Sequence, residues 1–253
     1  MDMKTRFIVR MQLFALAALL VGARAVAVPF ADGGVALQTV LNNITVNPLG
    51  ASSVNVLTDE VSPDSYWSVT AAGGAVSTII VELAAFKDGN KFGIYDRADP
   101  SKTVQVFAGL AGAGDTAVIS IKADGSVFVN FADTGVNFAA NSFGFYLDSS
   151  AFANGGFWRS DTALNGDGLD HMAAYRGEGD TVMLPGLPPS TWTPEEFVLG
   201  FEDLDASVSD KDFKDFVVMV ESIKPVPDGG STLVLLGSAL LAVGGIARRM
   251  RLC

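Results

Sequence analysis

The chain has 253 residues and is acidic, with 28 Asp and Glu against 17 Lys and Arg. Much of the positive charge lies at the two ends, so residues 26–228 keep 10 basic and 27 acidic residues, a formal charge of −17. Such a surface repels nucleic acid and attracts cations, which excludes DNA or RNA as a partner. The only cysteine is Cys253, so no internal disulfide is expected, and a domain of about 200 residues can build its core without one.

Residues 1–25 have the three parts of a secretory signal peptide. A basic start is followed by the apolar run 11–22, which is too short to span a bilayer stably, and then by the small residues Ala23 and Ala25. We expect cleavage after Ala25 and export of the remaining chain, and cleavage after Ala27 is nearly as well supported. A first core helix is the alternative interpretation.

Short runs rich in β-branched and aromatic residues, separated by Gly, Asp, Asn and Pro, recur through residues 26–224. They predict an all-β fold, a single β-sandwich of jelly-roll type. Asp124-Gly125 and Asp88-Gly89-Asn90 each supply the chemistry of a tight hairpin turn, and Leu37–Thr45 is either a strand or a short helix. The predicted strands are Ser53–Leu57, Tyr66–Thr70, Val76–Leu83, Phe92–Asp96, Thr103–Phe107, Thr116–Ile121, Ser126–Phe131, Ser142–Leu147, Thr181–Leu184, Phe197–Glu202 and Asp215–Glu221.

The C-terminal segment 226–253 has three ordered parts. A turn-forming stretch, Val226 to Gly230, precedes the apolar run Leu233–Ala247, and an arginine cluster with Arg248 and Arg249 follows. Counted from Gly229, the apolar segment has 19 residues, about enough for a ~30 Å hydrocarbon core. Because arginines stay on the cytoplasmic side, the segment predicts a transmembrane helix that anchors an exported domain in the inner membrane, at least transiently.

This tail resembles the PEP-CTERM class of bacterial sorting signals, most closely its VPDSG variant. Val226, Pro227, Asp228 and Gly230 match the motif, and Gly229 stands where the variant has Ser. The resemblance implies that a membrane-embedded exosortase recognises and cuts the tail, which releases the protein to the cell envelope or the extracellular biofilm matrix. A permanent C-terminal anchor is the alternative.

Near the end of the domain, two apolar runs bracket a segment that carries six carboxylates. Two such charges ~5 Å apart repel by ~3 kcal/mol at an effective dielectric constant of ~20, so the segment either spreads them into water or holds a cation. Ca²⁺ favours carboxylate and carbonyl oxygens in a flexible cage, and softer ligands are missing from this segment. Calcium is the predicted cofactor, and a solvated acidic turn is the alternative. The candidate metal ligands are Glu202, Asp203, Asp205, Asp210, Asp212 and Asp215.

Residues 143–223 also resemble an uncharacterised bacterial family, the domain of unknown function 4114. The resemblance implies a β-rich exported module and no known reaction. Lys214 stands where the family commonly has Asn, which removes one oxygen ligand. The matching stretches are Gly200-Phe201-Glu202-Asp203-Leu204, Asp210-Lys211-Asp212-Phe213-Lys214-Asp215, Asn165-Gly166-Asp167-Gly168 and Asp170-His171.

The segment Asp161–Met172 has the length of an EF-hand loop but lacks its ligands. Ala163 and Met172 stand where the loop requires oxygen donors. The segment could instead form a second wall of the acidic site, because the loops of a sandwich cluster at its ends. His171 is the only histidine, which excludes a histidine-based zinc centre, and we interpret it as a hydrogen-bonded structural residue.

No catalytic constellation is recognisable, because the sequence has neither a nucleophile elbow nor a phosphate-binding loop. We therefore expect a structural or interaction protein of the cell surface or matrix rather than an enzyme. The alternative is a carbohydrate-binding module for extracellular polysaccharide. A glycoside hydrolase needs two carboxyl groups across a cleft, and the sequence singles out no pair. The aromatic platform of a carbohydrate module would come from Tyr66, Trp67, Trp158 and Trp192.

Overall fold

The computed structural model describes residues 28–71, 74–82 and 89–227. The predicted signal peptide 1–25 and the predicted helix that follows Asp228 lie outside these residues. Within the described ranges, no helix has the length and apolar character that crossing a membrane requires.

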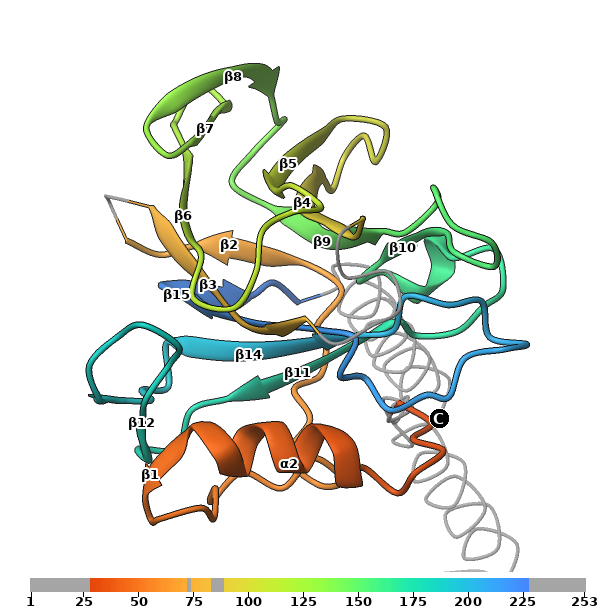
Figure 1. Cartoon of the computed structure of the whole chain (residues 1–253). Coiled ribbons are helices and arrows are strands. Elements are labelled where there is room, and N and C mark those ends of the chain that lie inside the picture. Colours follow the sequence, from red (N-terminus) through yellow and green to blue (C-terminus); the bar gives the residue numbers. More distant parts are fainter. Residues whose placement is uncertain (1–27, 72–73, 83–88, 228–253) are drawn as a thin grey trace, which may run out of the picture.

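Three antiparallel sheets form a β-sandwich (Figure 1), which confirms the all-β prediction. One large sheet contains, in spatial order, β16 (Ile223–Pro225), β2 (Trp67–Val69), β9 (Phe143–Asp148), β4 (Lys91–Asp96) and β5 (Thr103–Phe107), with β10 (Phe157–Arg159) also paired to β9. The other contains β11 (Met172–Arg176), β14 (Glu196–Phe201), β15 (Phe216–Glu221), β3 (Ala75–Glu82), β6 (Thr116–Ile121), β7 (Ser126–Val129) and β8 (Ala132–Asn137). The small third sheet consists of β1 (Thr45–Asn47), β12 (Thr181–Val182) and β13 (Ser190–Thr191).

Aromatic side chains fill the main core between the two large sheets. Phe92 on β4 is fully buried and stacks on Phe145 of the same sheet and on Phe216 of the opposite sheet, with ring centroids 5.5 and 5.3 Å apart. Trp67 packs against Phe197 across the same interface, at 4.9 Å. Aromatic pairs in these geometries add to the free energy gained by burying their area, so this cluster fixes the two sheets face to face.

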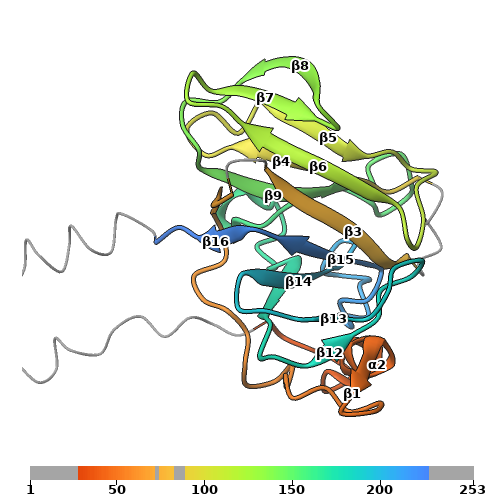
Figure 2. The ribbon, with the colours of Figure 1, turned by 90° about the vertical axis from the view of Figure 1, so that its left-hand side faces the viewer.

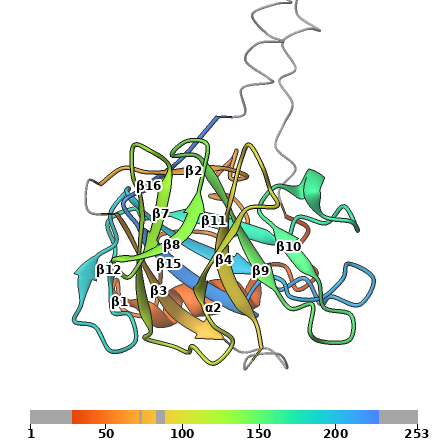
Figure 3. The ribbon, with the colours of Figure 1, turned by 90° about the horizontal axis from the view of Figure 1, so that it is seen from above.

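A second apolar layer covers the outer face of the seven-stranded sheet. Figure 2 shows the helix α2 (Val35–Ile44) below β14 and β15, and β4 and β9 above them; seen from above, α2 lies beneath the strands (Figure 3). On β14, Leu199 belongs to the main core and Val198 to the layer with α2. Because both faces of these strands are buried, their sequences are continuous apolar runs without alternation.

The segment left open as strand or helix forms α2. Leu37, Leu41 and Ile44 are buried along one side of it, at the spacing of an amphipathic helix. The Asp32 carboxylate accepts hydrogen bonds from the amides of Gly34 and Ala36, each at 2.7 Å. It thereby satisfies donors that the first turn leaves unpaired.

Most predicted strands are present with shifted ends, and the Asp124-Gly125 hairpin is confirmed, with Gly125 at φ +87°. The turn at Asp88-Gly89-Asn90 lies partly outside the described residues. The predicted strand Ser53–Leu57 is wrong, because side chains take up its backbone donors: Asp180 binds the Ser53 amide and Gln38 the Val56 amide. The sequence analysis missed β1, β8, β10, β11, β13 and β16.

Candidate functional site

The acidic loop, residues 202–215, joins two strands that pair with each other. Phe201 ends β14, Phe216 begins β15, and the two are register partners. Glu202 and Asp215 therefore leave the hairpin side by side. The Glu202 amide continues the ladder by donating to the carbonyl of His171, just before β11, at 3.0 Å.

Three of the predicted metal ligands come together within this loop. Carboxylate oxygens of Glu202, Asp210 and Asp215 all lie within 4.8 Å of one another. Glu202 is fully buried and Asp215 is 9% exposed, whereas Asp210 is exposed to solvent. The cluster is therefore enclosed by protein on one side and accessible to ions from the other.

Asp203 lies beside this cluster and connects the two large sheets. Its amide donates to the Asp215 carboxylate at 3.3 Å. Its carbonyl oxygen accepts hydrogen bonds from the Ser149 hydroxyl, at the end of β9, and from the Trp158 indole on β10. The Asn90 amide, next to β4, donates to its carboxylate at 3.0 Å. Asp203, two residues after β14, thus receives donors from β10 and from residues that adjoin β9 and β4 of the other sheet.

The remaining two candidate ligands have partners elsewhere. The Asp205 carboxylate accepts hydrogen bonds from the amide and the hydroxyl of Ser207 and closes a local turn. Asp212 is buried and forms an ion pair with Lys214. The structure therefore reduces the six predicted ligands to four carboxyl groups, those of Glu202, Asp203, Asp210 and Asp215, which we call the acidic cluster.

Crowding of buried carboxyl groups raises their pKa values. Burial, and then the charges of Asp203 and Glu202, raise the pKa of Asp215 to about 8. Burial also raises the pKa of Glu202 and of Asp203, although hydrogen bonds from Ser209 and Asn90 respectively oppose this. Like charges that share a buried site cannot all ionise at neutral pH. The acidic cluster consequently retains a proton there, which a bound cation would displace.

Asn90 adds an oxygen with no hydrogen-bond donor among the residues that the structure describes. The residue is 1% exposed, its amide nitrogen binds Asp203, and its Oδ1 atom accepts no hydrogen bond from those residues. A buried polar atom without a partner costs about 1–3 kcal/mol, so it calls for a physical reason. A cation beside the acidic cluster would supply one.

The segment predicted as a second wall does lie against the acidic loop. His171 is fully buried, stacks on Trp158 with ring centroids 3.9 Å apart, and bonds through Nε2 to the Asp167 carboxylate at 2.9 Å. Asp167 also accepts from the Ala206 amide at 2.9 Å. The Asp167 carboxylate therefore holds the acidic loop against His171 through hydrogen bonds. His171 is a hydrogen-bonded structural residue, as the sequence analysis interpreted it.

The aromatic residues named for a carbohydrate platform are largely inside the protein. Trp67 and Trp192 are fully buried and Trp158 is 6% exposed. The Tyr66 hydroxyl donates to Asp161 at 2.5 Å. A sugar stacks on the open face of an aromatic ring, and none of these three tryptophans presents one.

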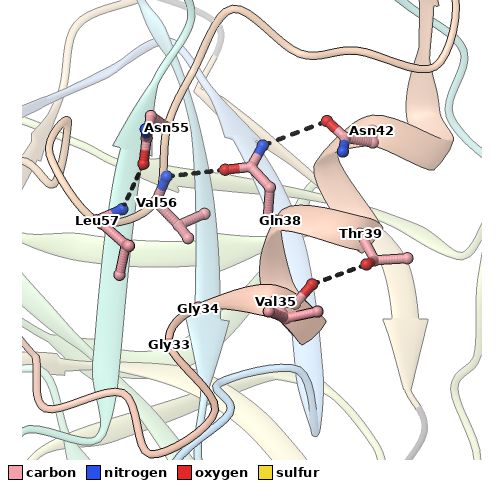
Figure 4. Close-up of a pocket in the computed structure, with 9 residues that line it drawn as sticks. All are labelled: Gly33, Gly34, Val35, Gln38, Thr39, Asn42, Asn55, Val56 and Leu57. Atoms are coloured by element: carbon pink, nitrogen blue, oxygen red, sulfur yellow. Dashed lines mark hydrogen bonds between the residues drawn. The ribbon is translucent and has the colours of Figure 1, made fainter.

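A pocket beside α2 offers little chemistry (Figure 4). It has a volume of about 320 Å³ and no charged side chain in its lining. Its polar groups bond to one another: Gln38 joins Asn42 and the Val56 amide, and the Thr39 hydroxyl donates to the Val35 carbonyl. The acidic cluster is therefore the stronger candidate site.

Comparison with known proteins adds one finding, at the C-terminus. Residues 225–250 match the VPDSG-CTERM motif, which supports a PEP-CTERM-type sorting domain there. The motif implies recognition by an exosortase and export toward the cell envelope. Neither the curated proteins nor the solved structures gave a match. The resemblance of residues 143–223 to the domain of unknown function 4114 stays a prediction.

Gly200 allows the acidic loop to pack directly on its own sheet. A β-carbon at this position would overlap the carbonyl oxygen of Phe213 and crowd Leu37. The Phe213 amide in turn donates to Glu202 at 2.6 Å. Gly200→Ala should therefore displace the loop and lower the free energy of unfolding by roughly 1–3 kcal/mol. Urea unfolding measures this cost, and Gly166→Ala, with open space around it, is the matched control. Equal midpoints for both variants would contradict the described packing.

Proposed function

We propose that this chain is an exported surface or extracellular-matrix interaction protein whose β-sandwich is stabilised by Ca²⁺ bound at the acidic cluster. The sorting motif supports the export and the exosortase as a partner. The observation that carries the calcium proposal is the approach of carboxylate oxygens of Glu202, Asp210 and Asp215 to within 4.8 Å of one another. The buried Oδ1 of Asn90, whose amide nitrogen binds the neighbouring Asp203, supports it. Binding rather than catalysis is the role proposed for this site.

The donor set suits calcium better than other common metals. Every candidate ligand is an oxygen, from Glu202, Asp203, Asp210, Asp215 and Asn90, and zinc or copper prefers nitrogen and sulfur. Ca²⁺ takes six to eight oxygens in flexible geometry, and the exposed position of Asp210 leaves room for water to complete the shell. Mg²⁺ demands a stricter octahedron and keeps more of its own water.

The position of the site indicates what a bound ion would do. Asn90 adjoins β4 of one sheet, whereas Glu202 and Asp215 flank the hairpin of the other. An ion held by both would join the two sheets at one end of the sandwich. The described part of the domain contains no cysteine, so this link would supply the kind of cross-link that exported domains often obtain from disulfides. Extracellular calcium modules work at dissociation constants of about 10⁻⁴–10⁻³ M.

We also assign residues 143–223 to the family of the domain of unknown function 4114. The motif stretches that suggest this family contact each other here: Asp167 binds the Ala206 amide, and His171 binds the Glu202 carbonyl at 3.1 Å. This contact supports one site built from both stretches. The carbohydrate alternative loses its proposed platform with the burial of the tryptophans.

Calcium should raise the melting temperature of the exported protein. At 100 times its dissociation constant, a ligand stabilises the fold by ~2.7 kcal/mol, or roughly 5–10 °C for a domain of this size. Asp215→Asn should abolish the increase, because the amide cannot supply the charge. It should also melt above the metal-free wild type, because wild-type Asp215 must take up a proton on folding at neutral pH, whereas Asn is uncharged in both the folded and the unfolded state. Thermal unfolding in excess calcium and in metal-free buffer measures both effects.

Asp205→Asn is the matched control, because Asp205 lies in the same loop but points to Ser207. Its calcium response should equal that of the wild type. The proposed site would be contradicted if calcium left the wild-type melting temperature unchanged. It would also be contradicted if calcium changed the melting temperatures of Asp215→Asn and Asp205→Asn by the same amount.

The stability of the metal-free protein should fall as the pH rises. The pKa of Asp215 is 3.8 unperturbed and about 8 in the folded state, so between these values the folded form binds more protons than the unfolded form. The contribution of Asp215 to the free energy of unfolding is fully present below pH 3.8. It is lost as the pH rises toward 8, at up to about 1.4 kcal/mol per pH unit. Calcium displaces that proton, so it should stabilise more at pH 8 than at pH 6.

Urea unfolding at the two pH values, with and without calcium, measures this difference. Burial also raises the pKa of Asp170, to about 6. Asp170 therefore adds a decrease in the free energy of unfolding at lower pH, and calcium should leave that decrease unchanged. A calcium effect of the same size at pH 6 and pH 8 would show that no titrating carboxyl group binds the ion.

The sorting motif begins inside the folded domain. Pro225 ends β16 and pairs with Trp67, and the Val226 amide donates to the Tyr66 carbonyl at 2.7 Å. The domain therefore holds Val226, the first residue of the Val-Pro-Asp sequence, against Tyr66. Processing by the exosortase would then take place with the folded sandwich against the membrane.

An epitope tag placed after Cys253 should separate from the domain in a host that has the exosortase. It should stay attached in a host from which the exosortase gene has been deleted. Immunoblots of membrane and medium fractions with antibodies to the domain and to the tag measure the separation. A tag that stays with the domain in both hosts would indicate a permanent anchor.

A further inference from the structure

Glu60 has a partly buried carboxylate that accepts a hydrogen bond from the backbone nitrogen of Val28. The Val28 nitrogen donates to Glu60 Oε2 at 3.1 Å, and Val28 itself is 5% exposed. Glu60 forms a β-bridge with Tyr175, which holds it against the end of β11. Within residues 28–71, 74–82 and 89–227, no Lys, Arg or His forms an ion pair with Glu60.

The surroundings of Glu60 favour a positive charge at that nitrogen. Burial raises the pKa of Glu60 to about 7, with a further contribution from the nearby Asp170. A carboxylate in such a place normally has a cationic partner. The missing counter-charge would lie where the Val28 nitrogen is.

The chain that follows Val28 is fixed to the domain. The Ala31 amide donates to the Lys211 carbonyl at 3.2 Å, and the Phe30 ring packs on Phe213 with centroids 5.0 Å apart. Both partners belong to the acidic loop. The Val28 nitrogen is therefore held in place by contacts on its C-terminal side.

The sequence before Val28 provides a way to create that charge. Ala25 and Ala27 are small residues at the −3 and −1 positions of a cut between Ala27 and Val28. Such a cut turns the amide nitrogen of Val28 into a free α-amino group, which is an ammonium at neutral pH. Hydrogen bonds between charged groups are about twice as strong as neutral ones. A cut after Ala25 would leave the nitrogen as a neutral amide.

We propose that the signal peptide is removed after Ala27 and that the new ammonium group of Val28 forms an ion pair with Glu60. Of the two cleavage positions that the sequence supports, the proposal favours the one after Ala27. Glu60 thus binds the amino terminus of the mature protein. Removal of the signal peptide supplies the positive charge that pairs with the Glu60 carboxylate. The proposal is independent of calcium binding and of the sorting motif.

The mass of the mature protein from the producing cell tests the cleavage site. The wild-type chain should begin at Val28. Ala23→Leu, which blocks only a cut after Ala25, should leave this terminus unchanged, whereas Ala27→Leu should move it to Val26. A wild-type protein that begins at any other residue overturns the proposal.

The ion pair has its own test. Glu60→Gln should lower the melting temperature of the protein that begins at Val28 by roughly 5 °C, and should change that of the Ala27→Leu protein little, because Gln accepts equally well from an amide. Glu178→Gln, at an exposed position, is the control. If Ala27→Leu blocks export, a Val28 protein acetylated at its amino terminus by semisynthesis replaces it. Equal costs of Glu60→Gln in the charged and the neutral forms overturn the ion pair.

Discussion

Four carboxyl groups meet where the two large sheets of this protein come together, and most of them are removed from water. Glu202 and Asp203 are almost completely buried, and Asp215 is 9% exposed. The β14–β15 hairpin gathers these charges, because Glu202 follows Phe201 and Asp215 precedes Phe216, and Phe201 and Phe216 are register partners. Their repulsion is tolerated by retaining a proton or by binding a cation. We propose that the pH dependence of the domain's stability and its response to calcium both follow from this constraint.

The hairpin and its acidic loop could be predicted from sequence, because two apolar runs and the carboxylates between them are contiguous. The choice among the six carboxylates could not, since Asp205 and Asp212 differ from their neighbours only in the local partners Ser207 and Lys214. The contact of Asn90 with Asp203 could not be predicted from the sequence, because the two residues are 113 positions apart. The strand β11 was missed for a local reason: its residues Met172 to Arg176 include two alanines and no β-branched residue.

Both ends of the described domain pack on the sandwich. The amino-terminal end contacts the acidic loop and the carboxy-terminal end is a strand of a large sheet. The segment after Val28 packs on Phe213 and the Lys211 carbonyl of the acidic loop. The last strand, β16, pairs with β2 and leads into the sorting motif. The described residues thus begin three positions after Ala25, where we predict signal-peptide cleavage, and extend into the sorting motif.

The most direct measurement is a crystal structure of the exported protein grown in calcium, with an anomalous difference map at the acidic loop. We expect a peak about 2.3–2.6 Å from carboxylate oxygens of Glu202, Asp210 and Asp215 and from the Oδ1 atom of Asn90. Carboxyl groups that bond only to one another and to water, with no peak among them at saturating calcium, would contradict it.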